Sequence, residues 1–153
     1  MIAHALAVIS NKYFGGNYNP ERIGMLGLYH ETSEVITGDL PTPVKYYNPE
    51  IRNAYKQIED IANRKLIGML PSDLQEEYTS LIYPNESELG ILKAADKLSA
   101  HIKCIEEVKS GNSEFKKALK ATKETLEQSP LPEVNYFIKN FLPAYSKTLD
   151  ELD

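Results

Sequence analysis

The chain has 153 residues, with 22 acidic and 17 basic side chains and a formal net charge of −5. This length suits one domain with a sizeable hydrophobic core. The basic residues are spread along the chain and the net charge is negative, which argues against a nucleic-acid polymer as partner. The chain has no run of about 18 apolar residues that could span a membrane, and no basic and apolar leader segment. We therefore expect no membrane partner.

Cys104 is the only cysteine. A single cysteine excludes an internal disulfide framework and suits a reducing compartment, so we expect a cytoplasmic protein. Cys104 lies beside an apolar stripe and fits a core position better than a nucleophile. Because the net charge is negative, an anionic substrate has to be attracted locally, and a divalent metal would do this.

Apolar spacing and helix-start signals predict an all-α fold, a bundle of six to seven helices, with no alternating stretch long enough for a strand. The first helix is expected from Met1 to about Phe14, ending at the Gly15-Gly16-Asn17 break. Two further starts are predicted at Asn19-Pro20-Glu21 and Asn48-Pro49-Glu50, because each offers an N-cap, a proline at the first helical position and an acid in the first turn.

Later segments continue the helical pattern. Another start is predicted at Pro71, where Ser72 and Gln75 have capping-box spacing. A helix over about 89–108 is expected to end at Gly111. The last two predicted helices are a charged surface helix over about 113–128 and a final helix with apolar residues from Val134 to Leu149, suited to docking on the core or on a second subunit.

The segment from Tyr29 to Tyr46, YHETSEVITGDLPTPVKY, is the densest in groups that bind metal or move protons. His30 and Glu34 are four residues apart, so a helix would place them on one face, with Glu31 rotated by about 100° from His30. Gly38 and the prolines that follow it should end that helix. Taken alone, these groups are more typical of solvated surface residues, and a partner elsewhere in the chain would raise their significance.

Asp96 is the best candidate for such a partner. The apolar positions Leu92, Ala95, Ser99 and Ile102 predict a stripe on one helix, and Asp96 falls on that stripe. An ionised carboxylate there is costly unless it is paired or binds a metal. Asp96 therefore either forms a salt bridge or joins His30 and Glu31 as a third ligand. His101, rotated by roughly 140° from Asp96, is interpreted as a bystander.

A resemblance connects these segments. A His-acid pair, a Glu three residues after it and a lone Asp on a later helix form a pattern similar to that of HD-domain phosphohydrolases. The surrounding sequence resembles the bacterial 5'-deoxynucleotidases of the YfbR-like type over nearly the whole chain, and the GDLPTPVKY element is specific to that group. The segments that carry the resemblance are AHALA at 3–7, FGGN at 14–17, ERI at 21–23, YHETSEVITGDLPTPVKY at 29–46, KAADKLSAHIKCIEE at 93–107 and GN at 111–112.

The resemblance implies a single HD-type domain over residues 1–153 that hydrolyses deoxynucleoside 5'-monophosphates to a deoxynucleoside and phosphate, as a homodimer. His30, Glu31 and Asp96 would hold one divalent cation, Co²⁺, Mn²⁺ or similar. Glu34 would transfer a proton at the reacting water or the leaving 5'-oxygen. The residues expected to contact the sugar and phosphate are Asp39, Leu40, Pro41 and Thr42.

Two features depart from the family pattern. The acid after His30 is Glu31 instead of the usual Asp, which is one methylene shorter. The family also carries a further ligand His and an Arg-Trp pair on segments before the equivalent of Met1, so we expect an N-terminally truncated relative. Two alternatives stay open: a catalytically impaired relative that binds nucleotide or metal, and a dimeric helical interaction domain without a ligand.

Overall fold

The computed structural model describes residues 1–45 and 47–151, without the side chains of residues 42, 43 and 149. Over these ranges the chain forms helices and no strands, which confirms the predicted all-α class. None of the described helices is both long and apolar enough to cross a membrane. The α-helices of eight or more residues are α1 (Ile2–Tyr13), α2 (Pro20–Tyr29), α5 (Pro49–Gly68), α6 (Gln75–Ile82), α7 (Glu86–Lys109), α8 (Lys116–Glu127) and α9 (Pro132–Asn140).

Shorter helices complete the chain. They are the one-turn helices α3 (Glu34–Thr37) and α4 (Thr42–Lys45), and the 3₁₀ helices η1 (Ser113–Phe115), η2 (Leu142–Ser146) and η3 (Leu149–Glu151). The chain separates into two compact units. The first contains Met1–Gly27 and the chain from Asn85 onward, and the second contains Leu28–Pro84. A single HD-type domain over the whole chain stays a prediction.

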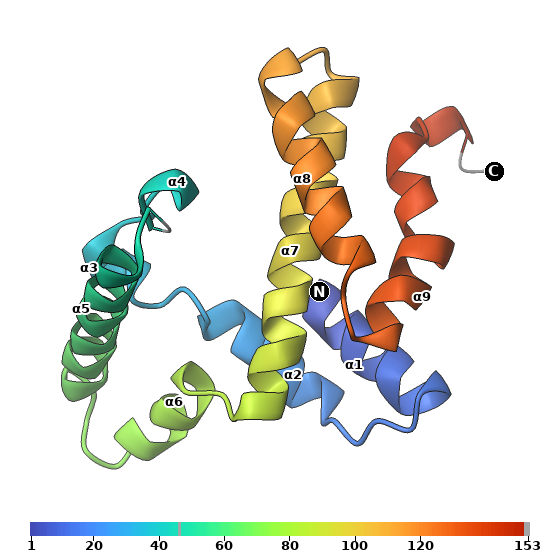
Figure 1. The fold of residues 1–153 in the computed structure, drawn as a ribbon. Coiled ribbons are helices and arrows are strands. Elements are labelled where there is room, and N and C mark those ends of the chain that lie inside the picture. The colour runs from blue at the N-terminus through green and yellow to red at the C-terminus, as the bar shows by residue number, and fades with distance from the viewer. Residues whose placement is uncertain (46, 152–153) are drawn as a thin grey trace. The chain divides into compact units, whose positions relative to one another are not determined.

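The first unit is built around α7, its longest helix. Figure 1 shows α8 running beside α7, and α1 packs against both α7 and α9. Burying this much apolar surface is the main force that holds the unit together. The side chains with no more than 1% exposure that form its centre are Leu6, Ala7, Ile23, Leu26, Ile91, Leu98 and Val134. Cys104 is also buried, as expected for a core cysteine.

The start of α7 is fixed by a capping box. The Asn85 side chain accepts a hydrogen bond from the Glu88 backbone N–H at 2.9 Å, and the Glu88 carboxylate accepts the Asn85 backbone N–H at 2.9 Å. The same carboxylate accepts from Arg22 Nε of α2 at 2.6 Å and from Arg22 Nη2 at 3.3 Å. Glu88 is only 7% exposed. One carboxylate therefore starts α7 and ties it to α2.

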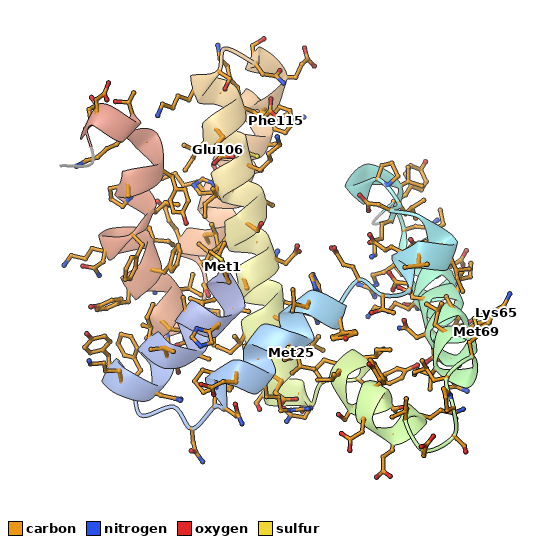
Figure 2. The ribbon with its side chains drawn as sticks, turned by 180° about the vertical axis from the view of Figure 1, so that it is seen from behind. Met1, Met25, Lys65, Met69, Glu106 and Phe115 are labelled. Atoms are coloured by element: carbon orange, nitrogen blue, oxygen red, sulfur yellow. The ribbon has the colours of Figure 1, made fainter. Side chains whose placement is uncertain are left out.

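The second unit is built around α5, with α3, α4 and α6 packed against it (Figure 1). Asn48 begins α5 as predicted, because its side chain accepts the Ile51 backbone N–H at 2.7 Å. The apolar face of α5 is only partly covered. Tyr55 and Ala62 are buried, whereas Ile61 is 66% exposed and Met69, labelled in Figure 2, is 67% exposed.

Two predicted boundaries in the later part of the chain are wrong. No helix starts at Pro71: α6 begins at Gln75, whose side-chain amide donates to the Leu70 carbonyl at 2.9 Å and makes no capping box with Ser72. The final helix ends at Asn140 and does not continue to Leu149. Pro143 has no backbone N–H to extend the α-helical ladder, and the chain continues as η2.

The bond between Glu88 and Arg22 should be visible in stability. We expect Glu88→Gln to lower the free energy of unfolding by about 1–3 kcal/mol at neutral pH, because a charged hydrogen-bonded acceptor is lost. Hydrogen bonding to Arg22 lowers the pKa of Glu88 below its ordinary value of 4.5. With a lowered native pKa, this stabilisation is present above pH 4.5 and is lost as pH falls through the native pKa.

Urea unfolding at a series of pH values measures this difference. The gap between the wild type and Glu88→Gln should narrow toward acid. Glu106→Gln is the matched control, because Glu106 is an exposed residue of the same helix, and its effect should stay within about 0.5 kcal/mol. A gap that is constant with pH would contradict a role for the charge.

Candidate metal centre

His30 and Glu31 lie in a turn, which corrects the prediction that one helix carries His30 and Glu34 on one face. Helix α2 ends at Tyr29, residues 30–33 form turns, and α3 begins at Glu34. The Tyr29 carbonyl accepts from the Thr32 backbone N–H at 3.1 Å and from the Thr32 hydroxyl at 2.6 Å. The Thr32 hydroxyl competes with the helical ladder for this carbonyl, so the helix ends here.

The turn after α2 places two potential metal ligands next to each other. His30 Nε2 lies 3.5 Å from Glu31 Oε1, and both side chains are more than one-third exposed. An imidazole nitrogen next to a carboxylate oxygen on an exposed turn can bind a divalent cation without burying an unpaired charge. The pair is therefore chemically suited to metal binding even though it lies on a turn.

Glu34 is partly buried at the start of α3. Burial raises the pKa of its carboxyl above the ordinary value, and the carboxylates of Glu31 and Asp39 raise it further. The charge of Lys45 acts in the opposite direction. Glu34 therefore holds a proton more readily than an exposed glutamate, which is the property a proton-transferring carboxyl needs.

The loop after α3 is anchored at its first residue. Gly38 has φ +68°, a left-handed angle that favours glycine, and its N–H donates to the Glu34 carbonyl at 2.9 Å. The Gly38 carbonyl in turn accepts from the hydroxyl of buried Tyr55 at 2.9 Å. Thr37 is thus the last residue of α3, as predicted, and the loop starts from a point fixed by α5.

Residues 39–45 contain more regular structure than predicted. The Pro41 carbonyl accepts the backbone N–H groups of Val44 and Lys45, which forms the single turn of α4. Proline is tolerated in this first turn because its missing N–H has no helical acceptor there. Asp39 and Pro41 are exposed and Leu40 is partly buried, while the side chain of Thr42 lies outside the described part of the structure.

Lys45 links α4 to α5. Its ammonium group lies 2.8 Å from Glu59 Oε1 and 4.9 Å from the centre of the Tyr55 ring. Neither Glu59 nor Tyr55 was predicted to belong to the site, because nothing in their own spacing on α5 relates them to a loop earlier in the chain. Only the packing of α4 on α5 brings these three side chains together.

Asp96 lies on α7, in the first unit, and is exposed. The prediction that it falls on the core stripe is wrong. The core-facing residues of α7 include Ile91, Leu98 and Ile102, whereas Ser99 is exposed. This stripe is rotated by roughly 60° from the predicted one, which leaves Asp96 outside it. Its carboxylate therefore requires no buried salt bridge.

The residues proposed as ligands share suitable chemistry. His30, Glu31 and Asp96 each offer one ligand atom, and all three are exposed. One imidazole and two carboxylates form a donor set that suits Mn²⁺, Co²⁺, Fe²⁺ or Zn²⁺. His101, by contrast, is buried and its Nδ1 lies 2.7 Å from the Thr122 hydroxyl; burial lowers its pKa.

Comparison with solved structures defines the class of protein. The fold matches an HD-domain phosphohydrolase from Listeria innocua with a TM-score of 0.79 and 27% sequence identity, covering 94% of this chain and 71% of that one. This match shows that the chain has the fold of an HD-domain phosphohydrolase. Its exposed His-acid pair after a helix and its lone acid on a later helix agree with that class.

Sequence comparison identifies the family within this class. The family model described as 5'-deoxynucleotidase YfbR-like matches residues 1–145. A 5'-deoxynucleotidase of Photobacterium profundum is 50% identical over 154 aligned residues, covering 99% of this chain and 79% of that protein. One of Photorhabdus laumondii is also 50% identical, covering 99% and 78%. The chain therefore belongs to the 5'-deoxynucleotidase YfbR-like family.

The environment of Glu34 can be tested in the metal-free protein. We expect its carboxyl to have a pKa above the ordinary value of 4.5. The titration is measured by NMR through the side-chain carbon resonance. Lys45→Met should raise the Glu34 pKa further, because it removes a positive charge, and Asp39→Asn should lower it. Lys56→Met, at an exposed position of α5, is the control and should leave the titration unchanged. A fall in the Glu34 pKa in Lys45→Met, or a rise in Asp39→Asn, would refute this account of the site.

Proposed function

We propose that the protein is a metal-dependent 5'-deoxynucleotidase that hydrolyses deoxynucleoside 5'-monophosphates to a deoxynucleoside and inorganic phosphate. The observation that carries this function is the near-half identity, over 99% of the chain, to proteins named 5'-deoxynucleotidase. The family model agrees over residues 1–145. The chain is accordingly a phosphoric monoester hydrolase.

The proposed metal ligands are His30, Glu31 and Asp96. Supporting this set are the 3.5 Å approach of His30 Nε2 to Glu31 Oε1 and the exposure of all three side chains. A divalent cation, Co²⁺, Mn²⁺ or similar, would lower the pKa of a bound water and offset phosphate charge. Glu31 is longer by one methylene than the aspartate usual in the family, and its exposed side chain has room to adjust to the ion.

Glu34 is the proposed proton-transfer group. Its raised pKa allows it to hold a proton near the reacting phosphate and to donate it to the leaving 5'-oxygen. Lys45 acts against this rise, because its positive charge favours the ionised carboxylate. Lys45 itself is engaged by Glu59, so we assign it to shaping the site and not to binding phosphate directly.

The loop formed by Asp39, Leu40, Pro41 and Thr42 is the proposed contact for the sugar and phosphate. Its support is the rigid start at Gly38, whose carbonyl is held by Tyr55. A loop fixed at this point can present the exposed Asp39 carboxylate to a sugar 3'-hydroxyl and form a wall that excludes a 2'-hydroxyl. We therefore propose a preference for deoxyribose over ribose.

We further propose a cytoplasmic homodimer. The second unit supports an interface, because Ile58 and Ile61 of α5 and Met69, directly after it, are each more than half exposed. Contiguous exposed apolar residues are typical of protein–protein contacts. A single buried free thiol, Cys104, is compatible with a reducing compartment.

Phosphate release from matched deoxyribo- and ribonucleoside 5'-monophosphates, with Co²⁺ or Mn²⁺ added, tests the activity. We expect release from the deoxy substrates and a loss of about 10²–10⁴-fold in Glu34→Gln, the range for removal of a general acid or base. Glu76→Gln, at an exposed position in the same unit, should retain activity. Equal turnover of both sugars would contradict the proposed loop role, and full activity in Glu34→Gln would contradict its catalytic role.

Metal content tests the ligand set independently of turnover. After incubation with Co²⁺ and dialysis, we expect one ion per chain in the wild type and at least about tenfold weaker binding in His30→Ala and Asp96→Asn. His4→Ala and Glu106→Gln are matched controls at exposed positions of α1 and α7, and they should bind like the wild type. Unchanged binding in either ligand variant, with helical content preserved by circular dichroism, would exclude that residue.

A further inference from the structure

A recess lies entirely within the first unit, between α7 and the end of α8 with the link to α9. Its volume is about 450 Å³, within the range of small-molecule sites. Four residues of α7 form one wall and the segment 125–131 forms the other. The residues that line it are Gly90, Lys93, Ala94, Lys97, Thr125, Leu126, Gln128, Ser129, Pro130 and Leu131. We call it the α7–α8 recess.

The recess is apolar inside and positively charged at its α7 edge. Ala94 and Leu126 are buried at its base. Lys93 and Lys97 are exposed and lie one helical turn apart, and within the described residues neither has an ion-pair partner. Three other lysines of the unit, Lys103, Lys120 and Lys123, each approach a glutamate four residues further on. The charge at the recess is thus uncompensated in a chain whose net charge is −5.

Two features of α7 keep the recess open and positively charged although each lowers the stability of the helix. They are the Lys93–Lys97 pair and Gly90. Like charges four residues apart on a helix are destabilising by about 0.2–0.5 kcal/mol, which applies to Lys93 and Lys97. A glycine inside a helix is about 1 kcal/mol less favourable than alanine, yet a Cβ at Gly90 would meet nothing within 4 Å. Packing therefore does not require glycine at this position, and its absent side chain leaves the recess open.

The opposite wall adds a hydrogen-bond donor. Ser129 Oγ accepts the Leu131 backbone N–H at 3.3 Å, so its own hydroxyl hydrogen is available to an acceptor in the recess. Thr125 is different, because its hydroxyl already donates to the Ala121 carbonyl at 2.9 Å. The polar groups able to meet a ligand thus include two ammonium groups, the Ser129 hydroxyl and the side-chain amide of exposed Gln128. The ammonium groups, the hydroxyl and the amide N–H can all donate to an anion.

From these observations we propose that the α7–α8 recess binds a small amphipathic anion, an apolar chain with one carboxylate or phosphate. The chain would cover Ala94 and Leu126, and the headgroup would lie between Lys93, Lys97 and the Ser129 hydroxyl. The mean direction of its residues on α7 is rotated by roughly 110° from Asp96. The recess is therefore separate from the proposed metal ligands and does not depend on the proposed function.

Decanoate is the probe, with decanol as its uncharged match, and binding to the full chain is followed by calorimetry and by backbone amide shifts. We expect decanoate to bind, to shift the amides of Gly90 and Ser129, and to bind at least about fivefold more weakly to the double variant Lys93→Gln, Lys97→Gln. Binding should weaken with salt, because the lysines are exposed. Decanol should bind more weakly than decanoate.

Gly90→Leu gives a steric test in which loss of folding is not expected, because leucine is a better helix former than glycine. It should abolish decanoate binding while raising thermal stability, whereas Gly90→Ala, which adds only a methyl group, should retain binding. Equal affinity for decanol, undiminished binding in Gly90→Leu, or shifts confined to other parts of the chain would overturn the proposal. Closure of the recess by a second copy, seen as concentration-dependent shifts without probe, would also overturn it.

Discussion

The carboxylate of Glu88 is the contact on which the first unit depends. It completes the capping box that starts α7 and it receives two hydrogen bonds from Arg22 of α2. Because α7 carries Asp96 and contacts α1 and α8, its starting point and direction determine what each of its faces meets. A nearly buried charge is tolerated only because each oxygen has donors. The interior apolar residues then pack around a helix whose position is already specified.

An equivalent role in the second unit belongs to Tyr55. Its hydroxyl holds the Gly38 carbonyl and its ring lies beneath Lys45, so one residue of α5 orders both ends of the loop that follows Glu34. The carboxylates near Glu34 would repel one another without a counter-charge, and Lys45 supplies it. Glu34, the candidate catalytic group, and the loop that starts at Gly38 are therefore coupled through side chains of α5, although neither of them belongs to α5.

Local chemistry explains which elements could be predicted. The starts at Pro20 and Pro49 were correct because an Asn, a Pro and an acid in succession satisfy the first helical N–H groups without help from the rest of the chain. The end of α2 at Tyr29 was not predicted. The Thr32 hydroxyl donates to the Tyr29 carbonyl there, and a threonine within an apolar pattern does not by itself indicate a helix end. The predicted start at Pro71 was wrong, because the Gln75 side-chain amide donates to the Leu70 carbonyl instead of forming a capping box with Ser72.

The sequence by itself determined the all-α class, the family and the candidate ligands His30, Glu31 and Asp96, because helical periodicity and short motifs are local properties that a chain displays before it folds. Only the tertiary structure decided that Asp96 stands outside the core stripe of α7, that Lys45 is held by Glu59, and that Gly90 borders an open recess. Each of these depends on which helices pack together. The rotation of a helix is set by its neighbours' side chains, and the spacing along its own sequence defines that rotation only to within tens of degrees.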